Sequence, residues 1–139
     1  VDRKQGHRAA ALVIKRFVEV LEQGKPLLIF PEGTRSEDGV IKDFKNGGFY
    51  AAVRANRPIV PVALEGTHRL MSKGAPDTGE TSAQFLRKRH IRVLIGEPIS
   101  PLVEGSEKDR VADLRDRTRV AVVAMHSELL VEAERLWGD

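Results

Sequence analysis

The chain has 139 residues, 41% of them hydrophobic and 31% charged, which suits one globular domain with one core. Its net charge of +3 fits an anionic small ligand or an anionic lipid surface, but the basic residues are too scattered and the aromatic residues too few for nucleic-acid binding. The absence of cysteine excludes disulfides, thiolate catalysis and cysteine-type zinc sites, and no apolar run is long enough to span a bilayer.

The first predicted element is a helix over residues 3–23. Gly24 and Pro26 end it, because glycine adopts the left-handed conformation of a helix end and proline cannot continue a helix. We expect this helix to be a plain packing element, since its apolar side chains recur at steps of three and four residues, as in Ala10, Val13, Phe17 and Leu21.

A short buried strand is predicted next, over the four apolar residues 27–30. Pro31 ends regular pairing because it has no N–H to donate, and Gly33 allows a tight turn. The turn presents a carboxylate, a guanidinium and two hydroxyls within five positions, from Glu32, Thr34, Arg35 and Ser36. Ligands of open α/β sheets often bind where a core strand ends, so this turn is a candidate site.

Arg35 is the strongest candidate for ligand binding. Its planar guanidinium can donate two parallel hydrogen bonds to a phosphate, and Glu32 is close enough to orient it or to accept from a substrate hydroxyl. The plainer alternative is a solvated turn residue, because residues 65–67 repeat the letters Glu-Gly-Thr without an arginine after them.

A helix over residues 46–55 and a second buried strand over residues 59–64 follow. Phe49, Ala52 and Val53 are expected to face the core, and the strand is expected to lie parallel to residues 27–30 because a helix connects the two. Lys45 stands before two glycines whose N–H groups could approach an anion closely. Lys45 is therefore a second candidate cation, with a simple surface charge at a helix start as its alternative.

The remaining chain is predicted as a long surface loop over residues 65–82, a third strand over residues 91–95 and a final helix. The basic run at residues 87–89 is either a solvated edge or a contact with an anionic membrane. Ser106 can cap the final helix, which runs to about residue 136 with one apolar side formed by Val111, Leu114, Ala121, Met125 and Leu129.

Four stretches together resemble the glycerolipid acyltransferases of the 1-acylglycerol-3-phosphate type. Phe-Pro-Glu-Gly-Thr-Arg-Ser at residues 30–36 is similar to the third conserved block of that family, and residues 58–64 are similar to the fourth. Residues 44–49 resemble the segment that links those blocks, and Val1-Asp2-Arg3 resembles the end of the second block. The resemblance extends from residue 1 to about residue 65.

This resemblance implies an α/β fold with a central mixed, partly parallel sheet flanked by helices. Residues 1–139 would be the C-terminal portion of one such domain, truncated at its N-terminus. The implied reaction moves a fatty acyl group from acyl-CoA or acyl carrier protein to lysophosphatidic acid, giving phosphatidic acid. The resemblance implies that the reaction needs no cofactor and no metal. It also implies that the protein is associated with the cytoplasmic face of a membrane. The implied acceptor-binding residues are Glu32, Gly33, Thr34 and Arg35, with Arg3 and Lys45 as further cations.

The family's general base, a histidine followed five residues later by an aspartate, is not found in this chain. The residues five positions after the four histidines are Leu12, Lys73, Ile95 and Val131. Because a hydroxyl attacks poorly until a base takes its proton, we expect the isolated chain to be inactive and the catalytic pair to lie upstream.

Three alternatives remain open from the sequence. The chain could be a non-catalytic module that binds anionic lipid or a phosphorylated ligand, or it could belong to an acyltransferase for another acceptor, such as glycerol-3-phosphate. A nucleotide-binding protein is the weakest alternative, because the usual glycine-rich phosphate-binding motifs are absent.

Overall fold

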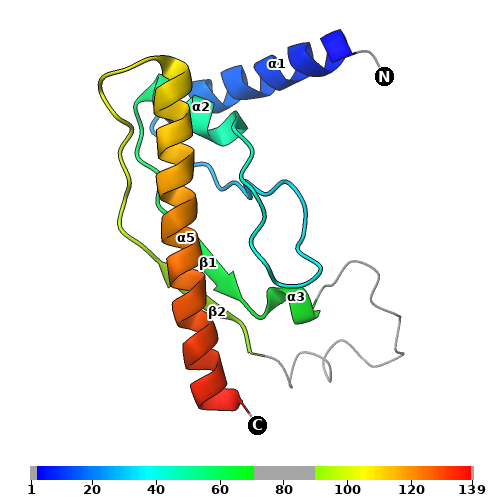
Figure 1. Ribbon diagram of the computed structural model, residues 1–139. Helices are drawn as coiled ribbons and strands as arrows, with labels where there is room; N and C mark the ends of the chain where they lie inside the picture. Colours follow the sequence, from blue (N-terminus) through cyan, green and yellow to red (C-terminus); the bar gives the residue numbers. More distant parts are fainter. Residues whose placement is uncertain (1–2, 71–89, 139) are drawn as a thin grey trace.

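The computed structural model describes residues 3–70 and 90–138. Figure 1 shows one long helix along which the other elements are arranged. In chain order the elements are α1 (Arg3–Glu22), α2 (Gly47–Ala55), β1 (Val62–Glu65), α3 (Thr67–Leu70), β2 (Arg92–Ile95) and α5 (Glu107–Trp137).

Helix α1 confirms the bounds of the first predicted element to within one residue, but of its predicted apolar stripe Ala10 and Val13 are exposed and Phe17 and Leu21 are only partly buried. Gly24 adopts φ +75, and the Lys25 N–H donates to the Val20 carbonyl oxygen at 3.3 Å. This is the left-handed ending that a glycine after the last helical turn favours. Only the C-terminal end of α1 lies near α2, and its N-terminal end projects away from the rest of the molecule (Figure 1).

Helix α5 begins at the predicted cap. The Ser106 Oγ accepts a hydrogen bond from the Asp109 N–H at 3.1 Å, which satisfies one of the free donors of the first turn. The helix buries one side along most of its length, at Val111, Leu114, Thr118 and Leu129.

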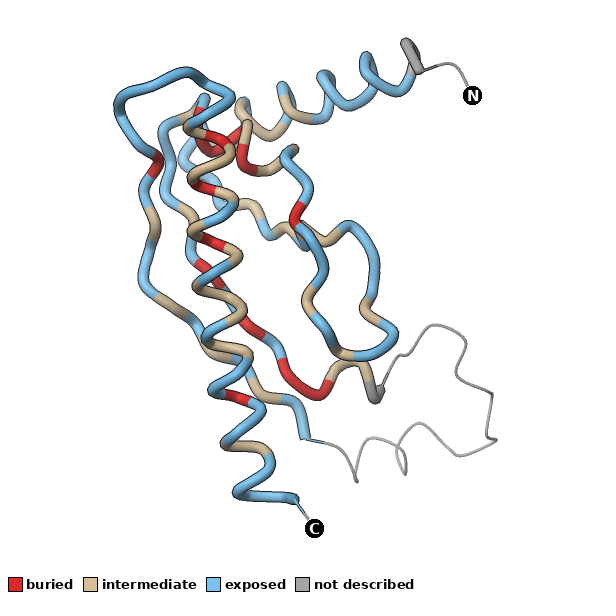
Figure 2. The backbone as a smooth tube through the Cα atoms, in the orientation of Figure 1, coloured by how far each residue is buried: buried red, intermediate tan, exposed pale blue. Residues whose placement is uncertain are grey.

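The hydrophobic core lies where α2 packs against the first half of α5. The rings of Phe44 and Phe49 stack with their centroids 6.2 Å apart. Figure 2 shows that buried parts of α2 and of the first half of α5 lie near one another at this junction. The inward positions predicted for the second helix are confirmed: the core consists of Phe44, Phe49, Ala52, Val53, Val111 and Leu114.

The sheet of the described residues is the antiparallel pair β1–β2, with Val62 opposite Ile95 and Glu65 opposite Arg92. Strand β2 confirms the third predicted strand. Strand β1 starts later than predicted because Pro61 cannot donate to the ladder; its carbonyl oxygen accepts from the Gly96 N–H at 2.9 Å.

The predicted buried strand at residues 27–30 is wrong for the described residues. This segment has no regular secondary structure, and Leu28 and Phe30 are 81% and 69% exposed. The parallel pairing expected between residues 27–30 and 59–64 is likewise not observed within residues 3–70 and 90–138. Four apolar residues favour burial, but a strand forms only where a neighbouring backbone supplies hydrogen-bond partners.

The predicted loop at residues 65–82 begins too early. Glu65 is the last residue of β1, and Thr67–Leu70 form α3. The Glu65 side chain is only 2% exposed, so it is an interior group and not part of a surface loop. The rest of that predicted loop, and the basic run at residues 87–89, lie outside the described residues.

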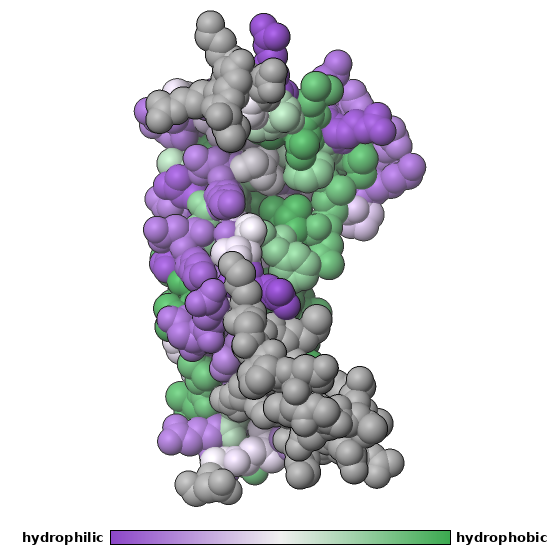
Figure 3. Space-filling view, turned by 90° about the vertical axis from the view of Figure 1, so that its right-hand side faces the viewer, coloured by the Kyte–Doolittle hydropathy of each residue, from purple (hydrophilic) through white to green (hydrophobic). Residues whose placement is uncertain are grey.

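Hydrophobic surface is exposed beyond the core. Figure 3 shows hydrophobic residues spread over one face of the molecule between more polar margins. The exposed hydrophobic side chains of the sheet and of the segment before the turn include Leu28, Phe30, Val62, Val93 and Ile95. None of the helices that the structure describes is both long and apolar enough to cross a bilayer.

Candidate functional site

Residues 31–46, here called the motif loop, connect residues 27–30 to α2. Gly33 adopts φ +70, and its N–H donates to the Phe30 carbonyl oxygen at 3.0 Å, which makes a tight turn. At the other end of the loop, the Lys45 N–H donates to the Pro31 carbonyl oxygen at 2.8 Å. The two ends of the loop are therefore held together, and the side chains between them are presented on a closed loop.

Lys45 lies directly against Gly33. A Cβ atom built on Gly33 would be 2.6 Å from the Lys45 Nζ and 2.8 Å from its Cε, closer than side chains can pack. The structure therefore brings together two of the predicted site residues, and a side chain at Gly33 would displace the end of the Lys45 side chain as well as strain the φ angle of the turn.

Glu32 is held by the far side of the loop. Its Oε2 accepts a hydrogen bond from the Lys42 N–H at 2.9 Å, and the Lys42 Nζ donates to the Arg35 carbonyl oxygen at 3.5 Å. Lys42 was not predicted as a site residue. Ten residues separate it from Glu32, and no local pattern in the sequence indicates that the loop folds back to join them.

The tip of the motif loop is also ordered by polar contacts. The Asp38 carboxylate accepts from the Val40 N–H at 3.0 Å and lies 2.9 Å from the Ser36 Oγ. These two donors lower the pKa of Asp38, the backbone N–H having the larger effect. Gly39 lies against the ring of His68, so the tip rests on α3.

Three cations of the loop have exposed side chains: Arg35, Lys42 and Lys45. Thr34 is exposed beside them, and Glu32 is half-buried. Several converging cationic donors are what a phosphate dianion needs, and a guanidinium can supply two hydrogen bonds at once. The loop can therefore serve as a site for a phosphate-bearing ligand.

Arg3 is not brought to this loop. It is the first residue of α1, at the helix end that Figure 1 shows pointing away from the motif loop, and its side chain lies outside what the structure describes. Its predicted role in binding stays a prediction.

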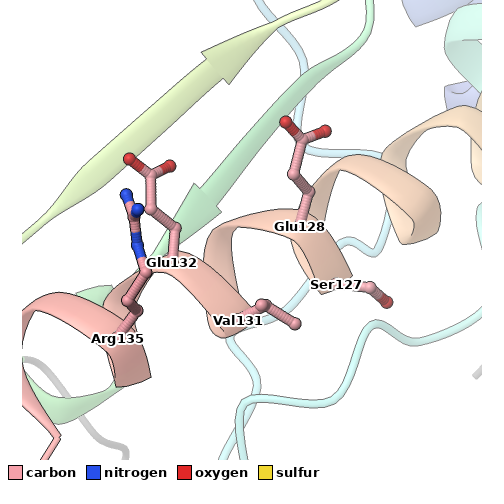
Figure 4. A pocket seen from close by; sticks show the side chains of 5 residues that line it. All are labelled: Ser127, Glu128, Val131, Glu132 and Arg135. Atoms are coloured by element: carbon pink, nitrogen blue, oxygen red, sulfur yellow. The ribbon is translucent and has the colours of Figure 1, made fainter.

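The depression on the surface of α5 is not at the motif loop. Figure 4 shows its lining side chains, which all belong to α5: Ser127, Glu128, Val131, Glu132 and Arg135. Among the residues that the structure describes, no group of three acidic or histidine side chains is placed to hold a metal ion.

Comparison with known proteins identifies the family. Residues 1–65 match the family model described as Acyltransferase. The chain is 32% identical to the human 1-acyl-sn-glycerol-3-phosphate acyltransferase alpha over 139 residues, which covers 100% of the chain and 45% of that protein. It is 34% identical over 111 residues to the chloroplastic 1-acyl-sn-glycerol-3-phosphate acyltransferase BAT2 of Brassica napus, covering 80% of the chain and 29% of that protein.

The fold has a counterpart among solved structures. The crystal structure of the 1-acyl-sn-glycerophosphate (LPA) acyltransferase PlsC from Thermotoga maritima matches with a TM-score of 0.64 and 29% identity, over 84% of this chain and 43% of that one. Residues 1–65 therefore match the acyltransferase family, and the α/β class of the chain is confirmed. Within that family its similarity is to the 1-acyl-sn-glycerol-3-phosphate acyltransferases, of whose length it spans less than half.

Proposed function

We propose that the protein to which these residues belong is an O-acyltransferase that acylates lysophosphatidic acid to phosphatidic acid, and that the motif loop binds the phosphate of the acceptor. The observation that carries this proposal is that one closed loop carries three exposed cations, with the Lys45 side chain against Gly33 and the Lys42 Nζ donating to the Arg35 carbonyl oxygen. The relatives named as 1-acyl-sn-glycerol-3-phosphate acyltransferases support the choice of acceptor.

In the proposed reaction, the free hydroxyl of the acceptor attacks the thioester carbonyl of acyl-CoA or an acyl carrier protein. A C–O bond forms, the C–S bond breaks, and the hydroxyl proton finally leaves with the thiol. The residues of this chain contribute binding and orientation: Arg35 grips the phosphate in a bidentate manner while Lys42 and Lys45 add charge. The thioester is already activated, so the proposal needs no cofactor and no metal.

We propose further that the protein works at the cytoplasmic face of a membrane. Its acceptor and product are lipids, and Leu28 and Phe30 are exposed immediately before the motif loop. Exposed apolar side chains beside a cationic loop fit an anionic lipid surface, where the headgroup of the acceptor lies.

The phosphate role can be tested with Arg35→Ala in the full-length protein. We expect the KM for lysophosphatidic acid to rise roughly tenfold or more, because a charge-assisted hydrogen bond to phosphate contributes about 1.5–3 kcal/mol. Arg57→Ala is the matched control, since Arg57 is an exposed arginine outside the loop. Unchanged kinetics for Arg35→Ala would rule out the proposed site.

The other acceptors and the non-catalytic alternative can be separated in the same system. Glycerol-3-phosphate offered in competition should be acylated poorly by the full-length protein. The isolated chain should show no acyl transfer above background, because it lacks the histidine and aspartate pair. Sedimentation of the full-length protein with phosphatidate vesicles but no acyl transfer would favour a binding module instead of an enzyme.

A further inference from the structure

We propose that Arg119 of α5 is a positioning residue for Glu32, acting through the peptide group that joins Ile41 to Lys42. This inference rests on the proposed function of the motif loop. It assigns a role to a residue of the C-terminal helix, well beyond residues 1–65 that match the family model.

The geometry places one peptide group between the two side chains. The Arg119 Nη2 donates to the Ile41 carbonyl oxygen at 3.1 Å, and the Lys42 N–H donates to the Glu32 Oε2 at 2.9 Å. The described chain has no cis peptide bonds, so this carbonyl and this N–H point in opposite directions from a single plane. The guanidinium therefore holds one side of the plane and the carboxylate holds the other.

Two features make this arrangement specific. The Arg119 Nε also donates to the Lys42 carbonyl oxygen at 3.2 Å, so the guanidinium grips two successive carbonyls and fixes the plane against rotation. Ile41 packs against the core cluster, which anchors the near side of the same peptide. A cation on the carbonyl also polarises the peptide and strengthens its N–H as a donor to Glu32.

The neighbouring arginines of α5 show that this contact belongs to one face of the helix. Arg115, one turn before Arg119, donates from its Nη1 to the Asn46 Oδ1 at 2.9 Å, at the other end of the motif loop. Arg117 lies between them and faces elsewhere, donating to the Ser100 carbonyl oxygen at 2.9 Å and to the Asp113 carboxylate. Arg117 can therefore serve as a matched control for Arg119, because it lies on the same helix but does not contact the motif loop.

The test is a double-mutant cycle on the full-length protein. Arg119→Met keeps the apolar stem and removes every donor; Glu32→Ala removes the carboxylate. We expect Arg119→Met to raise the KM for lysophosphatidic acid roughly twofold to twelvefold, the range that the net contribution of one hydrogen bond allows, with the KM for the acyl donor unchanged. In the Glu32→Ala background, Arg119→Met should add little, because interacting residues are not additive.

Controls separate positioning from folding. Arg117→Met should leave the acceptor KM unchanged in both backgrounds. Should Arg119→Met fail to fold, Arg119→Lys, which keeps the charge, enters the same cycle and should give an intermediate effect. Additive effects of Arg119 and Glu32 substitutions, or an equal rise in acceptor KM with Arg117→Met, would overturn the positioning role.

The outcomes distinguish this inference from the proposed function. If Arg35→Ala and Glu32→Ala both raise the acceptor KM but Arg119→Met is additive, only the positioning role fails. If neither Arg35→Ala nor Glu32→Ala changes the acceptor KM, the motif loop is not the acceptor site, and both proposals fail together.

Discussion

The motif loop and the core between α2 and α5 are adjacent in the fold but are ordered by different forces. In the core, Phe49 and Leu114 are almost completely removed from water, and burial of apolar surface stabilises the contact. In the motif loop, Ile41 and Phe44 reach the core, but the part that carries the exposed Arg35 and Lys42 is shaped by directional hydrogen bonds. Stability and ligand binding therefore depend largely on different residues, and substitutions should separate them.

The largest effect on stability is expected in the core. Leu114→Ala should lower the free energy of unfolding by about 2–5 kcal/mol, because it removes a fully buried side chain and leaves a cavity. Leu130→Ala on the same helix, at an exposed position, should cost much less. Urea denaturation measures both. A shift in the acceptor KM of folded Leu114→Ala as large as that of Arg35→Ala would contradict the separation of the two regions.

A comparison of two glycines tests the loop itself. Gly33→Ala and Gly24→Ala both place a side chain at positive φ, which costs roughly 1–2 kcal/mol. Only at Gly33 would the new Cβ collide with Lys45, whereas nothing lies within 4 Å at Gly24. We therefore expect similar losses of unfolding free energy, with a raised acceptor KM for Gly33→Ala alone. Equal acceptor KM values for the two variants would show that Lys45 and the turn do not act together.

Removing the helix cap of α5 should lower stability without changing acceptor binding. Ser106→Ala removes the acceptor of the Asp109 N–H and should cost about 0.5–2 kcal/mol of unfolding free energy. Ser127→Ala, at an exposed position within the same helix, is the control and should cost much less. Thermal denaturation and acceptor KM measured on the same samples check both halves of the prediction.

The smallest effect is expected from the ion pair that links α2 to the start of α5. Arg54 Nη2 and Glu107 Oε1 are 2.9 Å apart, and the hydrogen bond from Arg54 lowers the pKa of Glu107 below its ordinary value of 4.5. A lowered pKa means that the stabilisation is present above pH 4.5 and is lost as the pH falls through the lower value of the folded state.

Because both side chains are nearly half exposed, the pair should contribute at most about 1 kcal/mol. Glu107→Gln should therefore reduce the unfolding free energy slightly at pH 7 and make no difference at a pH low enough to protonate Glu107 in the folded state. Glu104→Gln is the control, and urea denaturation at the two pH values is the measurement. A loss of unfolding free energy in Glu107→Gln that is larger at low pH than at pH 7 would contradict this prediction.

The helices could be predicted from the sequence because their signals are local. The apolar period of α1, the Ser106 cap of α5 and the inward side chains of α2 all lie within a few residues of one another. The strands were predicted less well, since pairing depends on a distant partner. Residues 27–30 have the composition of a strand and no described neighbour to pair with, and Pro61 moves the start of β1.

In the candidate site, too, the contacts within one short segment could be predicted and the contacts between distant residues could not. Glu32, Gly33 and Lys45 were predicted and come together, because they belong to one loop that closes on itself. Lys42 could not be predicted from spacing alone, and neither could Arg119, whose contact with the loop joins residues 77 positions apart. Arg3 was assigned by resemblance, and the structure does not place it with the others.

Discrimination between acceptors tests the central claim most directly. The full-length protein and its Arg35→Ala variant should be assayed with lysophosphatidic acid and with a monoacylglycerol of the same acyl chain, which lacks only the phosphate. If the motif loop binds phosphate, Arg35→Ala should lower kcat/KM for lysophosphatidic acid roughly tenfold or more and leave the value for monoacylglycerol nearly unchanged. An equal fall for both acceptors would show that Arg35 does not recognise the phosphate.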